Sequence, residues 1–383
     1  MAEFLMPALG ADMESGTLAH WLVKEGDAVK RGDIIAEVET QKGIIDVEYF
    51  GSGIVERLLV GEGSHVPVGA TLAIISAPGE IPTTPAPAPP SIVEPSPEPV
   101  TVAERPPQRP ATRRARVTPA ARQRAVELGI DPVTIAGTGP GGAVVLVDVE
   151  RAIATVQPEV RRVDIAAMRA AMGAAMARSK REIPHYYLTT EIDTRQALDW
   201  LATTNATRPI TGRIIPAALL LKAVALACRK HPELNGYWRD GFEAAVEVNI
   251  GVGIAVRGGG LVSPAIHAAD TLDLDELMRR LLDLVNRARS GHLRSSEMSD
   301  GTISVTNLGD LGVTSVHGVI YPPQVALVGF GRITERPWAV DGLLGVRPIV
   351  TATISADHRA STGHQGGAFL STVGDLLQHP EAL

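Results

Sequence analysis

The sequence predicts a chain of several domains: a small all-β domain, then a small helical unit, then a large α/β domain. The length of 383 residues exceeds that of one ordinary domain. A proline-rich segment over 78–112 follows an internal repeat, and longer mixed helical and strand patterns follow later. We therefore expect domains over 1–77, 113–155 and 161–383, with a linker over 78–112.

The composition restricts the function classes before any motif is considered. A formal net charge of -7 argues against nucleic acid as the main partner, because phosphate-binding domains need a basic balance. We expect no membrane association, because no run reaches the roughly 18 apolar residues of a membrane span and the first residues do not resemble a signal peptide. The single cysteine, Cys228, fits a reducing cytoplasm and is expected to be a buried structural thiol.

The first domain is predicted from the repeat. Its two copies start at Gly16 and Gly53 and align at a constant offset, so that Gly26 matches Gly63. Each copy alternates short strand-like runs with glycine-containing turns. Two such copies can complete one core together, which predicts a small quasi-two-fold β-sandwich or barrel.

A lysine stands where the two copies meet. Lys42 lies between two strand-like runs and is predicted to occupy an exposed hairpin tip. Taken alone it is better described as a plain solvated lysine, but the repeat around it and the proline segment after it favour an attachment site. Twelve prolines over 78–112 favour extended polyproline II, at roughly 3.1 Å per residue, so the segment provides reach.

Residues 1–77 thereby resemble a lipoyl domain. The family's sequence around the modified lysine is close to Glu-Thr-Asp-Lys-Ala, and here it is Glu39-Thr-Gln-Lys42-Gly43. The resemblance implies that Lys42 carries lipoate in amide linkage. Biotin carriers have a similar fold, but the two methionines that usually flank their lysine are absent. Biotin on Lys42 is the alternative.

The second unit combines two short helices with a glycine-rich loop. Thr118 and Pro119 are typical of a helix start, and Asp148 is expected to open the second helix. The loop reads Gly137-Thr-Gly-Pro-Gly-Gly and lacks the Lys-Ser/Thr pair of a phosphate loop. The segment resembles the peripheral subunit-binding domain of 2-oxo acid dehydrogenase complexes. Ala143 stands where that family usually has arginine. The arginine-rich stretch over 105–124 is either a solvated tail or a dock for an acidic partner subunit.

The last domain shows helices interleaved with strands, which predicts one α/β domain with a mixed sheet. The expected helices cover 164–183, 215–230 and 271–289, and the expected strands cover 185–193, 246–256, 302–306, 325–330 and 348–355.

Two strand ends carry side chains suited to catalysis. His358 follows one predicted strand, and Thr306 ends another. A histidine at a strand end suits general-base catalysis because its pKa lies near neutral. The alternative is a structural histidine bonded to nearby backbone. No metal-ligand set is predicted.

Residues 161–383 resemble the catalytic domain of dihydrolipoamide acyltransferases, whose fold is like that of chloramphenicol acetyltransferase. The resemblance implies that His358 takes a proton from the thiol of coenzyme A, the acyl acceptor, and that Thr306 of a neighbouring subunit stabilises the oxyanion. The active site would then lie at a trimer interface. The matching stretches are 180–188, 248–252, 301–312, 322–324 and 355–359.

One position departs from the family motif His-x-x-x-Asp-Gly. Thr362 stands in the aspartate's place before Gly363. In the family that aspartate usually has a supporting role that organises the site, so we predict an enzyme whose activity is retained but lower. The alternative is a lipoylated scaffold that docks partners and has weak or no transferase activity.

The resemblance also implies partners. They are a 2-oxo acid decarboxylase subunit, dihydrolipoamide dehydrogenase, and further copies of the chain as a trimer or a larger cage. The expected acyl group is acetyl, from the resemblance of the stretch Pro184-His-Tyr-Tyr-Leu188 to acetyltransferases. Acetoin-cleaving and branched-chain complexes remain alternatives.

Overall fold

The computed structural model forms two compact units. One consists of Met1–Pro82 with Val163–Leu383, and the other of Thr83–Arg162. The linker predicted over 78–112 lies outside the described residues, which are 2–9, 13, 15–40, 43–76, 117–127, 135, 137–149, 165–256, 260–340 and 342–383.

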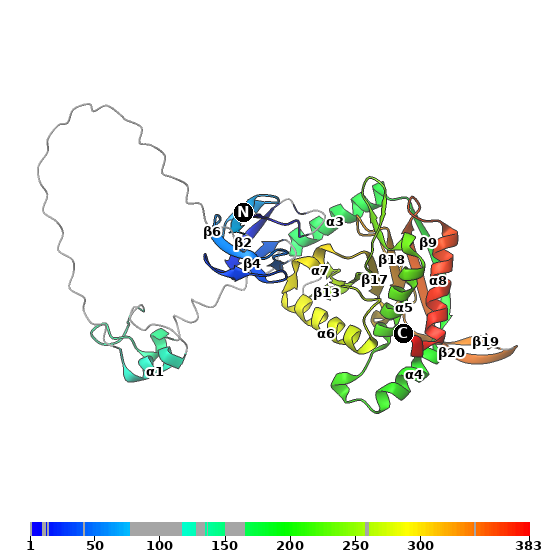
Figure 1. Ribbon diagram of the computed structural model, residues 1–383. Coiled ribbons are helices and arrows are strands. Elements are labelled where there is room, and N and C mark those ends of the chain that lie inside the picture. Colours follow the sequence, from blue (N-terminus) through cyan, green and yellow to red (C-terminus); the bar gives the residue numbers. More distant parts are fainter. Residues whose placement is uncertain are drawn as a thin grey trace, which may run out of the picture. The chain divides into compact units, whose positions relative to one another are not determined.

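The N-terminal domain is a sandwich of two β-sheets, drawn in blue in Figure 1. Side chains from both sheets meet in one core, including Phe4 and Ile75 from one sheet and Leu18 and Val38 from the other. The predicted small β-sandwich is therefore confirmed. The first sheet contains β1 (Ala2–Leu5), β8 (Thr71–Ser76), β6 (Gly53–Leu58) and β3 (Ala28–Val29), and the second contains β5 (Gly43–Glu48), β4 (Ile34–Thr40), β2 (Ser15–Trp21) and β7 (His65–Pro67).

The internal repeat of the sequence is also a repeat in the hydrogen bonding. Gly26 and Gly63 both adopt positive φ angles, 96° and 82°, which glycine tolerates best. The Gly26 N–H donates to the carbonyl of Val55, and the Gly63 N–H donates to that of Leu18, both at 2.7 Å. Each copy therefore closes its turn against a strand of the other copy, as quasi-two-fold symmetry requires.

The second unit is a small helical domain with its own core. Helix α1 (Pro119–Glu127) begins after Thr118, whose hydroxyl accepts the N–H of Ala121 at 3.4 Å. The second helix begins earlier than predicted, because residues 146–149 are already helical and Asp148 lies inside it. The Asp148 carboxylate instead accepts the N–H and hydroxyl of Thr138, at 2.8 and 2.6 Å, and so holds the glycine-rich loop.

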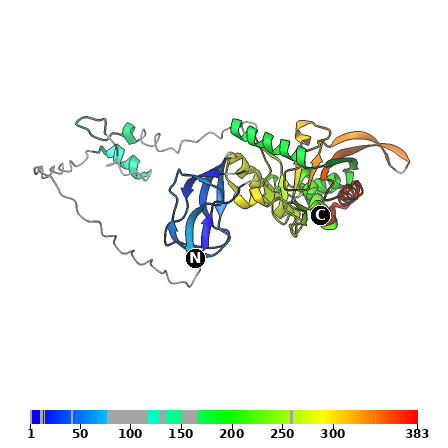
Figure 2. The same cartoon turned by 90° about the horizontal axis from the view of Figure 1, so that it is seen from above.

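The third domain is built on a seven-stranded mixed sheet. Its central strand is β20 (Leu343–Asp357), whose first half pairs with β19 and whose second half pairs with β9 and β18. The hairpin of β19 and β20 projects from the domain in both views (Figures 1 and 2). The remaining strands of this sheet are β9 (His185–Asp193), β12 (Ile250–Val252), β15 (Ala265–Ile266), β17 (Ile303–Asn307), β18 (Ala326–Phe330) and β19 (Thr334–Val340).

Helices cover this sheet and supply much of its core. The segment Ile210–Lys230 is long and apolar enough to cross a membrane by length and composition alone, contrary to our reading of the sequence. Its helix α5 is nevertheless a core helix, since Leu219, Val224 and Cys228 are buried against the sheet and α8. The helices are α3 (Ile165–Glu182), α4 (Arg195–Ala206), α5 (Pro216–Lys230), α6 (Leu274–Ser290), α7 (Ser295–Ser299) and α8 (Gly363–Gln378).

Short strands and turns complete the described residues. A two-residue strand, β16 (Leu293–Arg294), follows α6 and joins the second sheet of the N-terminal domain. Two small sheets pair β10 (Gly236–Trp238) with β11 (Phe242–Ala244) and β13 (Ile254–Val256) with β14 (Gly260–Val262). The 3-10 turns are η2 (Ile210–Gly212), η3 (Pro232–Leu234), η4 (Gly309–Leu311) and η5 (Pro380–Ala382).

Two predicted segments have different bounds in the structure. The strand expected over 246–256 is two strands, because β12 pairs within the main sheet whereas β13 pairs only with β14. The helix expected over 271–289 begins at Leu274, because the Asp273 carboxylate accepts the N–H of Glu276 at 2.7 Å and caps it.

Candidate active site

The strands that flank the predicted attachment lysine form the expected hairpin. β4 and β5 pair antiparallel, with Thr40 opposite Gly43. The Thr40 hydroxyl donates to the carbonyl of Gly43 at 2.9 Å, and Gly43 has a φ of 116°. Lys42 itself lies outside the described residues. The flanking residues nevertheless fit a group attached at a hairpin, because the two strands are locked together right up to it.

His358 stands directly after the end of β20, where the sequence places it. It is exposed, and its backbone N–H donates to the carbonyl of Pro184 at 3.0 Å. The ring of Tyr186 meets the imidazole edge-on, with centroids 5.2 Å apart. A histidine that is fixed through its backbone and still exposed can exchange protons with a bound substrate.

The residues on either side of His358 form an ion pair between a buried carboxylate and a partly exposed guanidinium. The fully buried Asp357 carboxylate accepts from Nε and Nη2 of Arg359, at 3.0 and 2.7 Å. The Arg359 guanidinium also lies over the ring of Trp238, 4.5 Å from its centroid. A buried carboxylate is costly unless it is paired and hydrogen-bonded, and this one is both. The pair therefore holds the chain firmly around His358.

Tyr186 is a second support that we missed in the sequence. Its hydroxyl lies 2.9 Å from the Ser361 hydroxyl, and burial raises the pKa of Tyr186 above its ordinary value. The phenol therefore stays protonated at neutral pH. Tyr186 and Arg359 both lie in the stretches that carried the family resemblance, but spacing alone gave no reason to single them out.

A second histidine lies beside the first and is held neutral. Burial lowers the pKa of His185, and its Nε2 lies 3.2 Å from the N–H of Ile320, from which it accepts. The proton is then on Nδ1, which donates to the carbonyl of Ile183 at 2.9 Å. His185 thus has both nitrogens occupied and ties the start of β9 to the segment around Ile320.

Thr306 lies near the end of β17 with its hydroxyl available. It is half-buried, and a Cβ built on Gly253 would come within 3.2 Å of its Oγ1, so glycine leaves room beside the hydroxyl. Ser304, two residues earlier on the same face, bonds Gln324 at 2.7 Å. Among the described residues nothing hydrogen-bonds the Thr306 hydroxyl, so it is free to donate to a substrate.

One chain does not bring Thr306 and His358 together. Thr306 is level with Gly329 on β18, whereas the N–H of Asp357 bonds the carbonyl of Val325, before β18 begins. The two side chains are thus offset along the sheet by on the order of 15 Å, at about 3.3 Å per residue. A site that uses both residues therefore needs two copies of the chain.

Thr362 has a structural role that explains the departure from the family motif. It is the N-cap of α8, where its Oγ1 accepts the N–H of Gln365 at 3.4 Å and the Gln365 side chain accepts the N–H of Thr362 at 2.9 Å. Threonine and aspartate are both good N-cap residues. The uncharged threonine thus keeps the start of α8 in place beside His358.

Family models match this chain in three consecutive stretches. Residues 2–75 match the model described as "Biotin-requiring enzyme", which covers biotin and lipoyl attachment domains. Residues 115–150 match an E3-binding domain, and residues 157–383 match the catalytic domain of the 2-oxoacid dehydrogenase acyltransferases.

Curated relatives align with nearly the whole length of this chain. The dihydrolipoyllysine-residue acetyltransferase component of the pyruvate dehydrogenase complex of Zymomonas mobilis is 31% identical, over 99% of this chain and 98% of that protein. The corresponding mitochondrial protein of Caenorhabditis elegans is also 31% identical, over 99% of this chain and 84% of that protein.

Solved structures share the fold of the third domain. A probable dihydrolipoamide acetyltransferase from Listeria monocytogenes is 29% identical with a TM-score of 0.53, covering 55% of this chain and 92% of that one. The dihydrolipoamide acetyltransferase of Azotobacter vinelandii, 24% identical with a TM-score of 0.53, has the same fold and covers 56% of this chain and 90% of that one. The chain therefore belongs to the family of 2-oxoacid dehydrogenase acyltransferases.

Proposed function

We propose that this chain is the acetyltransferase component of a pyruvate dehydrogenase complex, moving an acetyl group from lipoyl-Lys42 to coenzyme A. One observation carries the proposal: relatives with that name align with it from end to end, as in the Zymomonas and Rickettsia conorii proteins, each over 99% of this chain. The cytoplasm is the proposed compartment.

His358 is the proposed general base. Lipoate on Lys42 supplies the acyl group as a thioester. The thiol of coenzyme A is mostly protonated at neutral pH, if its pKa is near the roughly 8.5 of a cysteine. His358 accepts that proton, so that the sulfur can attack the thioester carbonyl, and then returns the proton to the departing dihydrolipoyl sulfur. A positioned base of this kind contributes about 10²–10⁴-fold in rate.

Thr306 is the proposed donor to the carbonyl oxygen as negative charge develops. The offset within one chain supports a donor from a neighbouring subunit, and a trimer is the proposed assembly. The Azotobacter vinelandii enzyme was investigated for the catalytic roles of a serine, a histidine and an asparagine. Those residues are spaced along that chain as Thr306, His358 and Thr362 are spaced along this one. The uncharged third residue there supports an active enzyme here.

The E3-binding domain supports dihydrolipoamide dehydrogenase as one partner, and the decarboxylase subunit of the complex as another. Ala143 does not disturb the loop that the domain depends on. Its carbonyl accepts the N–H of Gly139 at 2.8 Å, and the neighbouring Val144 is buried in the domain's core.

Two measurements test this function. The intact mass of the protein should show a lipoyl adduct on Lys42, whereas a biotin adduct would contradict the assignment. Acetyl transfer from free acetyl-dihydrolipoamide to coenzyme A should exceed transfer of a branched acyl group.

His358→Ala should lower the acetyl transfer by about 10²–10⁴-fold. His65→Ala, a change to an exposed histidine of the N-terminal domain, is the control and should leave the rate with the free substrate unchanged. If the wild-type protein transfers no acetyl group, the chain is a lipoylated scaffold and not a transferase. If His358→Ala is as active as wild type, His358 is not the general base.

A further inference from the structure

The short strand β16 extends a sheet of the N-terminal domain. Leu293 and Arg294 pair in parallel with Ile45 and Asp46 of β5, and β5 begins at Gly43, directly after Lys42. Among the strands that the structure describes, β16 pairs with none of the catalytic domain. The segment 291–298, which we call the docking edge, thus pairs with the strand that follows the attachment lysine.

Polar groups of the two domains form hydrogen bonds with each other at the end of the paired strands. Glu48 is only 8% exposed, although its side chain ends in a carboxyl group. Its N–H donates to the Ser295 hydroxyl at 3.2 Å, and the Ser296 hydroxyl donates to its carboxylate. Burying a carboxylate costs free energy unless hydrogen bonds replace the lost water. Ser296 of the docking edge supplies such a bond to the carboxylate, and Ser295 accepts the backbone N–H of the same residue.

An apolar side chain joins the two domains at the same place. Met298 packs against the core of the catalytic domain and also against the core of the N-terminal sandwich. Methionine adapts its shape easily, which suits a surface that is covered and uncovered in turn.

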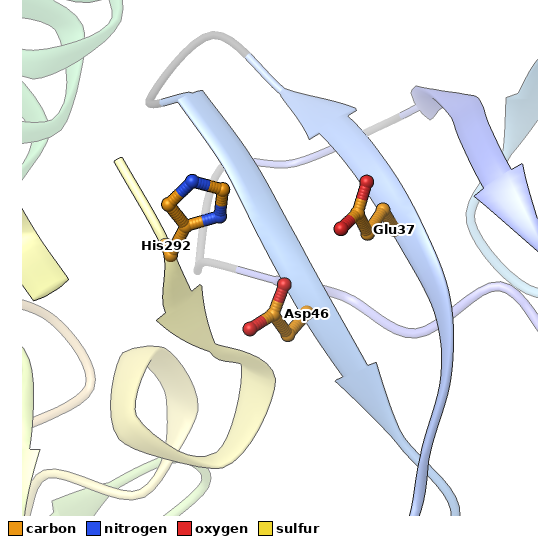
Figure 3. A group of neighbouring side chains, drawn as sticks. All are labelled: Glu37, Asp46 and His292. Carbon is orange, nitrogen blue, oxygen red and sulfur yellow. The ribbon is translucent and has the colours of Figure 1, made fainter. Parts of the chain in front are cut away.

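Basic and acidic side chains face each other across the contact. Figure 3 shows His292 facing Asp46 on β5, with Glu37 on the neighbouring strand, and ligand atoms of the three lie within 4.8 Å of one another. Burial and Glu37 raise the pKa of Asp46, while His292, Arg287 and Arg294 oppose that rise. Basic groups of the catalytic domain therefore relieve the repulsion between two carboxylates of the N-terminal domain.

We propose that the docking edge receives the chain's own lipoyl domain by strand addition to β5, which holds the lysine-bearing hairpin against the catalytic domain. This inference rests on the proposed function, because only an acylated Lys42 makes the docking productive. Backbone pairing provides affinity without regard to side chains, and the matched serines and charges select this strand. Exposed charge pairs are screened by salt, so docking should weaken as ionic strength rises.

A cross-link tests the geometry. Asp46 and Arg294 are directly paired, and neighbouring strands lie about 4.8 Å apart, within the Cα separation of about 4.4–6.8 Å that a disulfide spans. The full chain with Asp46→Cys and Arg294→Cys should form an intrachain disulfide under mild oxidation. Asp46→Cys with Arg279→Cys, which places the second thiol on the exposed face of α6, is the control. Equal yields in both proteins, or a bond mainly between copies, would overturn the proposal.

A charge reversal tests the function of the docking edge. Arg294→Asp places a good N-cap residue before α7 and repels Asp46, whereas Arg279→Asp makes the same charge change elsewhere. Arg294→Asp should slow transfer from acylated Lys42 by roughly 3–10-fold at low salt, and Arg279→Asp should not.

Transfer from free acetyl-dihydrolipoamide should be unchanged in both variants. If free substrate is not used at all, the proposed function fails while the cross-link still decides the docking. If free substrate is used and Arg294→Asp is as fast as wild type from Lys42, the docking edge is not used.

Discussion

The position of His358 depends on residues that do not react. Asp357 is buried and paired with Arg359, so the backbone on both sides of the imidazole is fixed. The ring of Tyr186 packs against one side of the His358 imidazole, and the Tyr186 hydroxyl is hydrogen-bonded to that of Ser361. Catalytic groups need to be held close to their productive geometry, and these four residues provide that support.

His185 makes the stability of the catalytic domain depend on pH. Burial lowers its folded pKa below the ordinary 6.5, so below about 6.5 the unfolded chain binds a proton that the folded protein resists. The unfolded state then holds more protons, and the free energy of unfolding falls as the pH drops. His185→Gln should reduce this loss, as measured by denaturant unfolding between about pH 7 and pH 5.

His267 provides a control of opposite sign. Its hydrogen bond to Asp300 raises its pKa, so its contribution is present below about 6.5 and is lost as the pH rises through the folded pKa. In His267→Gln the free energy of unfolding should therefore fall more steeply as the pH drops. An unchanged slope in His185→Gln would show that His185 does not titrate as argued.

At this scale the sequence pointed to candidate reactive groups but not to the residues that hold them. His358 and Thr306 could be singled out because imidazole and hydroxyl groups at strand ends suit the chemistry. Arg359 could not, because its pairing with Asp357 and its place over Trp238 depend on three-dimensional contacts. Thr362 appeared to be a loss of charge, and only the start of α8 shows it to be a cap.

The cap of α8 gives a stability prediction at the scale of elements. Thr362→Ala removes the oxygen that accepts the Gln365 N–H and should lower the free energy of unfolding of the catalytic domain by about 1 kcal/mol. Thr362→Asp should keep the stability within about 0.5 kcal/mol, because aspartate caps equally well. Chemical denaturation, read at the unfolding transition of the catalytic domain, measures the free energy of unfolding of both variants. Equal decreases in the two variants would contradict the capping role.

Elements with strong local signals were predicted with accurate bounds. The strand 185–193 and helix α5 match the sequence interpretation, because alternating residues and a proline start define them locally. β20 is much longer than the expected 348–355, because its first half exists only through pairing with β19. β16 could not be predicted at all, since two residues become a strand only when another strand pairs with them.

The whole assembly can be tested by complementation. His358→Ala and Thr306→Val should each be nearly inactive, because a site would lack its base or its donor. If the proposed trimer forms and each site takes its histidine and its threonine from adjacent subunits, mixtures of the two variants should regain about a quarter of the wild-type sites. Acetyl transfer after co-refolding measures this. No gain over the separate variants would place both residues in one subunit's site.

The burial of Cys228 has a consequence for the chemistry of the whole molecule. Its thiol is 1% exposed inside α5, and burial raises its pKa, so it stays protonated and shielded. Disulfide exchange needs a thiolate that can be reached. The oxidised carrier presents a cyclic disulfide to this protein, yet the single cysteine offers no reachable thiolate to open it. A mixed disulfide that would trap the carrier on the protein is thereby avoided.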